Sequence, residues 1–127
     1  MTDGIEAVTT SVLGLALDAA SLRQQAIAAN IANADAVGYV PLKVSFEAQL
    51  EDARRALDDG GKLSADMLAG VAPRIEADTS ATTWSGKVRL DVEMAKMTQN
   101  AVQYQALIKG LSKHFSILSS AVNDGKR

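Results

Sequence analysis

The 127-residue sequence contains no cysteine, one histidine, two prolines and few aromatic residues. The absence of cysteine excludes disulfide bonds, thiol catalysis and thiolate metal sites. Aromatic residues make up only 4% of the chain, so the 47% that is hydrophobic consists mainly of alanine, leucine, valine and isoleucine. Compact cores usually depend on large aromatic side chains, whereas small aliphatic ones suit long helices that pack side by side. The composition therefore predicts a mainly α fold.

The sequence also lacks an excess of charge of either sign. Thirteen basic and fifteen acidic residues leave a net charge of −2, and the densest basic groups are the pairs 54–55 and 126–127. A nucleic-acid partner requires a basic patch that replaces counterions on phosphate. We therefore expect no nucleic-acid partner.

Long uninterrupted apolar runs are missing as well. The apolar stretch that begins at Val12 is interrupted by Asp18 and then by Arg23, so we expect no direct membrane span. The first six residues include two acidic and no basic ones, so they lack the basic segment with which a cleaved signal peptide begins. Taken alone, these features favour a protein that is made and kept in the cytoplasm.

Residues that carry chemistry are few and scattered. His114, the single histidine, has no ionisable residue one helical turn before it. The acidic pairs 51–52 and 58–59 consist of adjacent residues, which point in different directions on a helix. No phosphate-binding glycine loop, HExxH pattern or calcium-binding loop occurs. We expect no catalytic residue, no metal ligand and no cofactor, and hence a protein that is not an enzyme.

Two long helical patterns occupy the ends of the chain. The first covers residues 5–33, and its apolar stripe alternates spacings of four and three: Val8, Val12, Leu15, Ala19, Leu22, Ala26 and Ala29. Such a stripe is typical of helices that pack in a coiled-coil-like manner. Nearly half of its residues are alanine, which allows a partner helix to approach closely.

The second pattern is longer and follows the same alternation without interruption. Its members are Leu90, Met94, Met97, Ala101, Tyr104, Ile108, Leu111, Phe115, Leu118 and Val122. A sustained repeat of 3.5 residues predicts a coiled-coil-like seam. Because its bulky side chains complement the alanines of the first stripe, we predict that the two helices pair antiparallel, with both chain ends on one side.

The residues beside the second seam indicate that it has further partners. A free two-stranded coiled coil usually carries opposed charges there, but here most flanking residues are short or uncharged, and Leu107 and Ile117 widen the apolar face. Exposed apolar patches of this extent mark interaction sites. The sequence therefore predicts an assembly seam that neighbouring copies or other proteins cover.

The chain divides into residues 1–36, 37–87 and 88–127, of which the first and last form one structural domain of two paired helices. In the middle part, residues 42–46 alternate as a short strand and residues 46–57 suit a short charged helix. The remainder up to Gly86 contains few residues able to form a core, so we expect a mobile loop or small irregular module. Trp84 is expected to fold onto the base of the second helix.

The exit from the first helix contains the most informative segment, which includes Asn30, Ile31, Ala32, Asn33, Gly38 and Tyr39. Asn33 continues the seam at a position where a buried polar side chain sets the register of two helices. Gly38 supplies a backbone that accepts positive φ after a helix. Tyr39 is expected to anchor the turn on the helix pair.

This segment resembles the N-terminal signature of flagellar rod and hook proteins, in which an Asn-Ile-Ala-Asn core precedes a Thr-Pro-Gly-Tyr-Lys turn. Residues 24–35 and 38–39 carry the resemblance, and residues 90–107 are similar to the C-terminal helix of proximal rod proteins. The chain departs from the pattern at 36–37, where Ala-Val replaces Thr-Pro, and at 40–41, where Val-Pro replaces the usual basic residue. Loss of the proline leaves the turn less rigid.

The resemblance implies a structural subunit of the proximal rod in the basal body of the bacterial flagellum, the organelle of motility. It implies self-assembly through the terminal helices into the tube that transmits torque. The implied neighbours are further copies of the chain, the rod proteins FlgC and FlgF and the adaptor FliE. It also implies passage through the flagellar type III export apparatus without a cleaved signal peptide, and hence a periplasmic location. A cytoplasmic helical adaptor or chaperone of the same export system is the alternative, and a related rod protein or one from a secondary flagellar system stays open.

Overall fold

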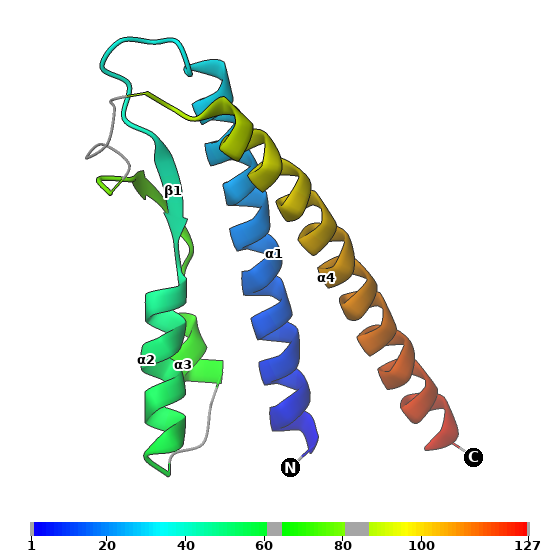
Figure 1. Ribbon diagram of the computed structural model, residues 1–127. Coiled ribbons are helices and arrows are strands. Elements are labelled where there is room, and N and C mark those ends of the chain that lie inside the picture. Colours follow the sequence, from blue (N-terminus) through cyan, green and yellow to red (C-terminus); the bar gives the residue numbers. More distant parts are fainter. Residues whose placement is uncertain (1, 61–64, 81–86, 127) are drawn as a thin grey trace.

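The computed structural model describes residues 2–60, 65–80 and 87–126 and is mainly helical (Figure 1). In chain order its elements are α1 (Thr2–Ala32), β1 (Leu42–Ser45), α2 (Glu47–Asp58), α3 (Ala65–Ala69), β2 (Arg74–Ala77) and α4 (Leu90–Asp124). The two long terminal helices contact each other and run in opposite directions, so that α1 starts and α4 ends on the same side of the molecule (Figure 1). This confirms the predicted helical hairpin. Trp84 lies outside the described residues.

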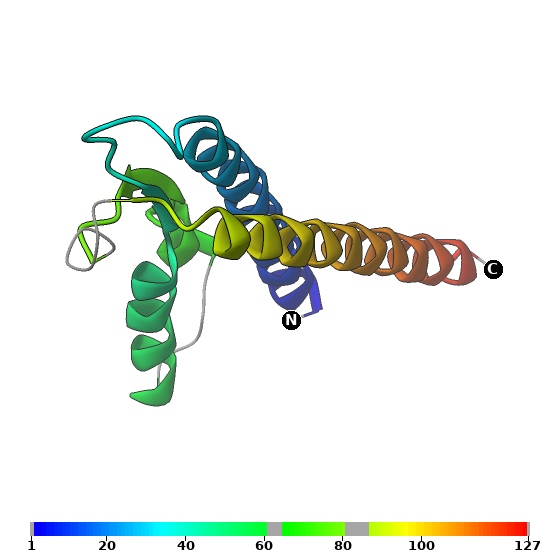
Figure 2. The same ribbon diagram turned by 45° about the horizontal axis from the view of Figure 1, so that its top comes forward.

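Helix α1 is the central element of the fold. It contacts α4 along one side, and it also contacts β1, β2 and α3 (Figures 1 and 2). Its alanines make these close contacts possible, because Ala19, Ala20 and Ala26 are at most 2% exposed. A larger side chain at these positions would hold the neighbouring elements apart.

The middle of the chain forms a small module beside α1. Strands β1 and β2 pair antiparallel, with Leu42 opposite Ala77 and Ser45 opposite Arg74. Gln49 of α2 ties this module together, since its Nε2 donates to the Ala72 carbonyl at 3.3 Å and its Oε1 accepts from the Ala72 N–H at 3.1 Å. Strand β1 and helix α2 confirm the strand and helix predicted for residues 42–57.

A small apolar core joins this module to α1. Ala19 packs with Phe46 and Val71, and Leu15 and Leu50 are packed against this group. As expected, the middle of the chain holds minor β structure, and the described residues 65–80 pack on α1 as part of a small module. Leu68 and Val71, which are 4% and 7% exposed, are among the buried apolar residues of this module.

The predicted seam of α4 differs from the face that packs on α1. The buried and half-buried residues of α4 are Val92, Glu93, Met97, Asn100, Leu107, Leu111, His114 and Leu118. Only Met97, Leu111 and Leu118 of the predicted seam belong to this inner stripe. The difference arises because three polar residues of the stripe find hydrogen-bond partners on α1, as described below. On α1, Leu15 and Ala19 pack against the middle module as well, and not only toward a partner helix.

Candidate functional site

The closed end of the hairpin contains a polar junction made of Asn30, Tyr39, Leu42 and Glu93. Asn30 is 1% exposed and uses both ends of its carboxamide. Its Oδ1 accepts from the Leu42 N–H at 2.8 Å and from the Tyr39 hydroxyl at 2.9 Å. Its Nδ2 donates to the Leu42 carbonyl at 2.9 Å and to Glu93 Oε2 at 3.1 Å. One side chain of α1 therefore binds the turn, β1 and α4 together.

The turn after α1 brings these groups to Asn30. The Ala36 N–H donates to the Asn33 carbonyl at 3.0 Å, and Gly38 follows with φ of 77°, which favours glycine. The chain then reverses so that the Tyr39 hydroxyl reaches back to the helix. Ala36 and Val37, which stand where the resembled family has Thr-Pro, are both exposed. The turn thus forms around Gly38 without a proline.

The structure assigns different roles to the two asparagines of the predicted motif. Asn33 is half-buried, and its Nδ2 donates to the Ala29 carbonyl of its own helix at 2.8 Å. It is Asn30 that makes the contacts between elements. Ile31 is half-buried and Ala32 is exposed. The buried polar side chain expected at this helix exit is therefore present, but three residues earlier.

Glu93 places a carboxylate inside the polar junction, where it is 5% exposed. It accepts from Asn30 Nδ2 and from Lys96 Nζ, each at 3.1 Å. A buried charge requires such partners, because its desolvation is otherwise strongly unfavourable. Burial raises the pKa of Tyr39 above its ordinary value, and the negative charge of Glu93 raises this pKa further.

Two further polar contacts join α1 and α4 farther along the hairpin. Asn100 Nδ2 donates to the Ala20 carbonyl at 2.8 Å and to Gln24 Oε1 at 3.1 Å. Thr10 Oγ1 and His114 Nε2 lie 3.3 Å apart, within hydrogen-bond distance. His114 therefore contacts the other helix. Sequence reasoning missed Glu93 and Asn100, although their seven-residue spacing with Leu107 and His114 was a usable signal.

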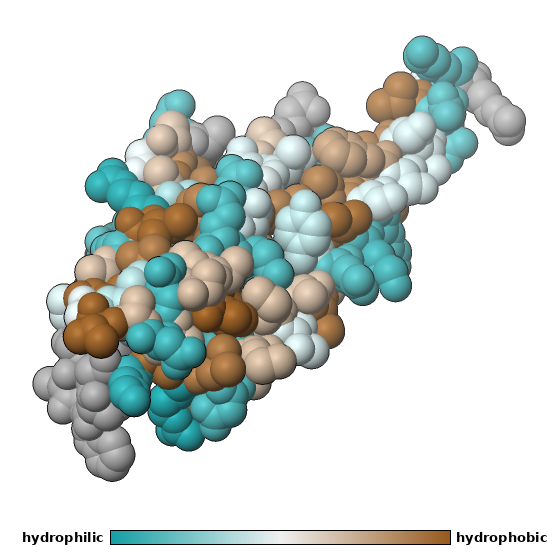
Figure 3. Space-filling view, turned by 90° about the horizontal axis from the view of Figure 1, so that it is seen from above, coloured by the Kyte–Doolittle hydropathy of each residue, from teal (hydrophilic) through white to brown (hydrophobic). Residues whose placement is uncertain are grey.

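The other half of the predicted seam forms an exposed row on α4. Its members follow one another at seven-residue spacing: Met94, Ala101, Ile108, Phe115 and Val122. The four large side chains are 58%, 44%, 50% and 58% exposed in that order. In the space-filling view the C-terminal arm of α4 projects from the body and carries hydrophobic side chains among polar ones (Figure 3). The row lies directly beside the inner stripe.

The remaining seam residues lie at intermediate positions. Leu90 is 46% exposed at the start of α4, and Tyr104 is 40% exposed while lining a hollow with Ala20 and Gln24. On α1, Val12 and Leu22 are half-buried, and Ala26 faces both β1 and α4 across a cavity. Some residues of the predicted seam therefore contact other parts of the chain, and the others lie on free surface.

The described parts of the chain contain no group of three histidine, cysteine or acidic side chains placed to hold a metal ion. Among the helices of residues 2–60, 65–80 and 87–126, none is long and apolar enough to cross a membrane. A helical hairpin with a buried polar junction and an exposed apolar row has the features of a structural subunit.

Comparison with known proteins defines the class of this subunit. The pattern of the flagella basal body rod protein family matches residues 12–39, which contain Asn30 and the turn up to Tyr39. The chain is 31% identical over 116 residues to the flagellar basal body rod protein FlgB of Bacillus subtilis (strain 168), an alignment that covers 87% of this chain and 90% of that protein. It is 26% identical over 129 residues to FlgB of Proteus mirabilis (strain HI4320), with the same coverage.

The class is therefore that of the flagellar basal body rod proteins. Within this class, the chain belongs to the FlgB family. It is a structural subunit of the flagellar rod, a part of the motility organelle, and not an enzyme.

Proposed function

We propose that this subunit assembles into the periplasmic rod by burying the exposed row of α4 against the terminal helices of neighbouring subunits. The observation that supports this proposal is the exposure of Met94, Ile108, Phe115 and Val122 on one side of a long helix. Burying each half-exposed side chain would contribute roughly 1 kcal/mol of stabilisation. Subunits that repeat along a tube would multiply this contribution.

The proposal divides the chain by its role in assembly. Residues 1–36 and 88–127 form the domain that builds the tube, and residues 37–87 form a module carried beside it. Contacts within one subunit use the inner stripe and the polar junction, and contacts between subunits use the exposed row. Helix α4 then has separate faces for folding and for assembly.

The proposed neighbours are further copies of the chain, the rod proteins FlgC and FlgF, and the adaptor FliE. Subunits are proposed to leave the cell through the flagellar type III export apparatus without a cleaved signal peptide. The proposal therefore predicts that the purified organelle contains the chain with its N-terminus intact.

Mass spectrometry of purified hook–basal bodies from the native bacterium tests the proposal. We expect the intact chain in these particles, and we expect a deletion strain to lack both complete rods and filaments. A chain found only in the cytosol, in a strain whose basal bodies are complete without it, would contradict the proposal. That outcome would favour a cytoplasmic adaptor or chaperone of the export system.

A further inference from the structure

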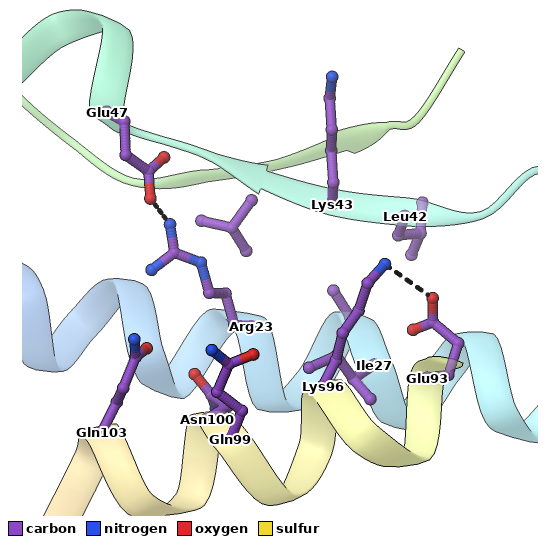
Figure 4. A pocket seen from close by; sticks show the side chains of 12 residues that line it. Arg23, Ile27, Leu42, Lys43, Glu47, Glu93, Lys96, Gln99, Asn100 and Gln103 are labelled. Atoms are coloured by element: carbon purple, nitrogen blue, oxygen red, sulfur yellow. Dashed lines mark hydrogen bonds and ion pairs between the residues drawn. The ribbon is translucent and has the colours of Figure 1, made fainter. Parts of the chain in front are cut away.

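A groove lies between β1 and α4, and α1 forms its floor (Figure 4). It encloses about 400 Å³ and is lined by β1 on one wall, by α4 on the other and by Ala26 and Ile27 below. The roles described above for the polar junction and for the exposed row do not explain this groove. We propose that this β1–α4 groove binds an extended segment of another protein, which pairs with the outer edge of β1 as a third strand.

The outer edge of β1 lines the groove and carries unpaired backbone groups at Val44, a residue that is 8% exposed as a whole. The Pro41 carbonyl accepts a hydrogen bond from the Asp78 N–H at 2.7 Å. This bond identifies the edge of β1 that faces β2. The Leu42 N–H and carbonyl point the other way, to Asn30. Because backbone groups alternate between the two edges of an antiparallel strand, the Val44 N–H and carbonyl lie on the same outer edge as those of Leu42. Within the described residues, these two Val44 groups have no hydrogen-bond partner on that edge.

Asn30 already occupies the first position along this edge. Its carboxamide donates to and accepts from Leu42 as a residue of a neighbouring strand would. The edge is therefore closed at Leu42 and open at Val44, one pairing position further along. An incoming strand would pair with Val44, beside the position that the Asn30 carboxamide occupies at Leu42.

The opposite wall presents groups that suit the second edge of a strand. Gln99 and Gln103, four residues apart on α4, extend toward the groove, and Asn100 stands between them (Figure 4). An amide side chain both donates and accepts, as a peptide group does. Asn100 is 5% exposed, and its Oδ1 is buried without a partner in the described chain. Because this oxygen is buried, the groups of this wall that remain accessible to an occupant are the side-chain amides of Gln99 and Gln103.

The charges of the groove favour a neutral occupant. Arg23 pairs with Glu47, and Lys96 pairs with Glu93 at 3.1 Å (Figure 4). The Lys43 side chain points away from the two helices (Figure 4). A phosphate-bearing ligand would require cations that are free of such partners. An uncharged polypeptide backbone does not.

A helix would not satisfy the same groups. Its backbone donors and acceptors are paired internally except at its ends, so it would leave the Val44 N–H and carbonyl without partners. An extended segment has free donors and acceptors on both sides, and addition of a strand to a sheet edge is a recurrent mode of peptide recognition. The geometry therefore selects an extended segment.

Nuclear magnetic resonance of the full-length, ¹⁵N-labelled chain tests this proposal. The probe is a synthetic peptide with the sequence of residues 72–79, because it contains β2, a strand already able to pair with β1. We expect saturable shifts at the Val44 backbone amide and at the Gln99 and Gln103 side-chain amides, with slower hydrogen exchange at Val44. The Lys43 amide, which faces β2, is the internal reference and should not change.

One control peptide and two variants of the protein isolate the pairing. The same peptide with N-methyl groups on residues 75–78 lacks the backbone donors of these four residues and should not bind. Val44→Pro removes the outer N–H, and Gln103→Ala removes one amide of the opposite wall without touching β1. Each variant should weaken peptide binding by about fivefold, the effect of losing one hydrogen bond.

Three outcomes would overturn the proposal. The first is the absence of a saturable change at Val44, and the second is equal binding of the methylated peptide. The third is protection of the Val44 amide that rises with protein concentration when no peptide is present. This last result would assign the groove to a second copy of the chain and not to another protein.

Discussion

Asn30 and Leu42 exchange two hydrogen bonds in the manner of paired residues on neighbouring strands, although Asn30 belongs to a helix. The Leu42 N–H donates to Asn30 Oδ1 at 2.8 Å, and Asn30 Nδ2 donates to the Leu42 carbonyl at 2.9 Å. This pairing fixes where β1 begins relative to the end of α1. It also explains why a carboxamide, with a donor and an acceptor side by side, is suited to this position.

Replacement of Asn30 tests the polar junction. Asn30→Ala leaves Leu42, Tyr39 and Glu93 without their shared buried partner, so we expect the free energy of unfolding to fall by about 2–4 kcal/mol. Urea unfolding followed by circular dichroism measures this change. Asn33→Ala is the matched control, since Asn33 bonds only within its own helix exit. It should cost less than about 1 kcal/mol. Equal losses in the two variants would contradict the role of Asn30.

Tyr39 should make the protein sensitive to alkaline pH. Its folded-state pKa is raised by burial and by Glu93, so its contribution to stability is present below the ordinary tyrosine pKa of about 10. That contribution is lost as the pH rises above this value through the raised pKa. In Tyr39→Phe we expect this part of the alkaline loss to disappear, together with about 1 kcal/mol of stability at neutral pH from the missing hydrogen bond to Asn30.

Unfolding of both proteins in urea between pH 8 and pH 11 measures the difference. Glu93→Gln, which removes the charge but keeps the shape, should lower the Tyr39 pKa while burial keeps it above the ordinary value. Ultraviolet titration of the phenolate gives this pKa, with Tyr104 as the second tyrosine in the spectrum. A Tyr39 pKa unchanged by Glu93→Gln would contradict the electrostatic part of the argument.

The exposed row and the inner stripe should respond differently to the same substitution. Ile108→Asp and Phe115→Asp place a charge on free surface, so we expect them to change stability by no more than about 0.5 kcal/mol. They should nevertheless abolish rod assembly and motility, because a neighbour would have to bury the charge. Swimming assays and the composition of purified basal bodies measure this effect.

Two substitutions on the same helix serve as controls. Leu111→Asp lies on the inner stripe and should destabilise the isolated chain by about 2 kcal/mol or more. Lys109→Asp is exposed and off the row, so it should leave stability and motility intact. Normal motility in Phe115→Asp would refute assembly through the row.

Substitution of Gly110 tests whether a neighbouring helix packs closely against α4 in the rod. A Cβ atom built on Gly110 has no neighbour within 4 Å. Gly110→Ala should therefore stabilise α4 by about 0.5–1 kcal/mol, because alanine has the higher helix propensity. Thermal unfolding measures this gain. Gly38→Ala is the contrasting variant, since its φ of 77° is unfavourable for alanine and should cost about 1 kcal/mol.

Motility assays of the Gly110→Ala strain complete this test. Motility that stays normal means that no neighbouring helix packs closely at Gly110 in the rod. Loss of motility in a more stable subunit would instead place a close intersubunit contact at this position.

The sequence was sufficient to predict the two terminal helices and their antiparallel pairing. Their apolar residues recur at regular spacing over long segments, and this local signal is strong. The turn could be predicted at Gly38 for a similar reason, since few residues other than glycine adopt positive φ there. Alanine in α1 correctly indicated close packing, although the neighbour of Ala19 is Phe46 of the middle module.

The face of α4 that packs on α1 could not be predicted in the same way. Glu93, Asn100 and His114 look like surface residues because their partners lie 63, 80 and 104 positions away in the sequence. An apolar-periodicity argument therefore chose the neighbouring row, which is more hydrophobic but faces solvent. Strand β2 was missed for a related reason, since its short sequence becomes a strand only beside β1, 32 positions earlier.

The polar junction lies at one end of the hairpin. It therefore restricts movement between the two long helices more at that end than at the other. Near Asn30 and Asn100 the two long helices are joined by directional hydrogen bonds, so sliding of one helix past the other would break several of them at once. Toward the free ends Thr10 and His114 make such a contact, and residues 119–124 are exposed. Opening the hairpin therefore costs least where α1 begins and α4 ends. A subunit built in this way keeps a fixed register at its closed end and is least constrained at its free ends.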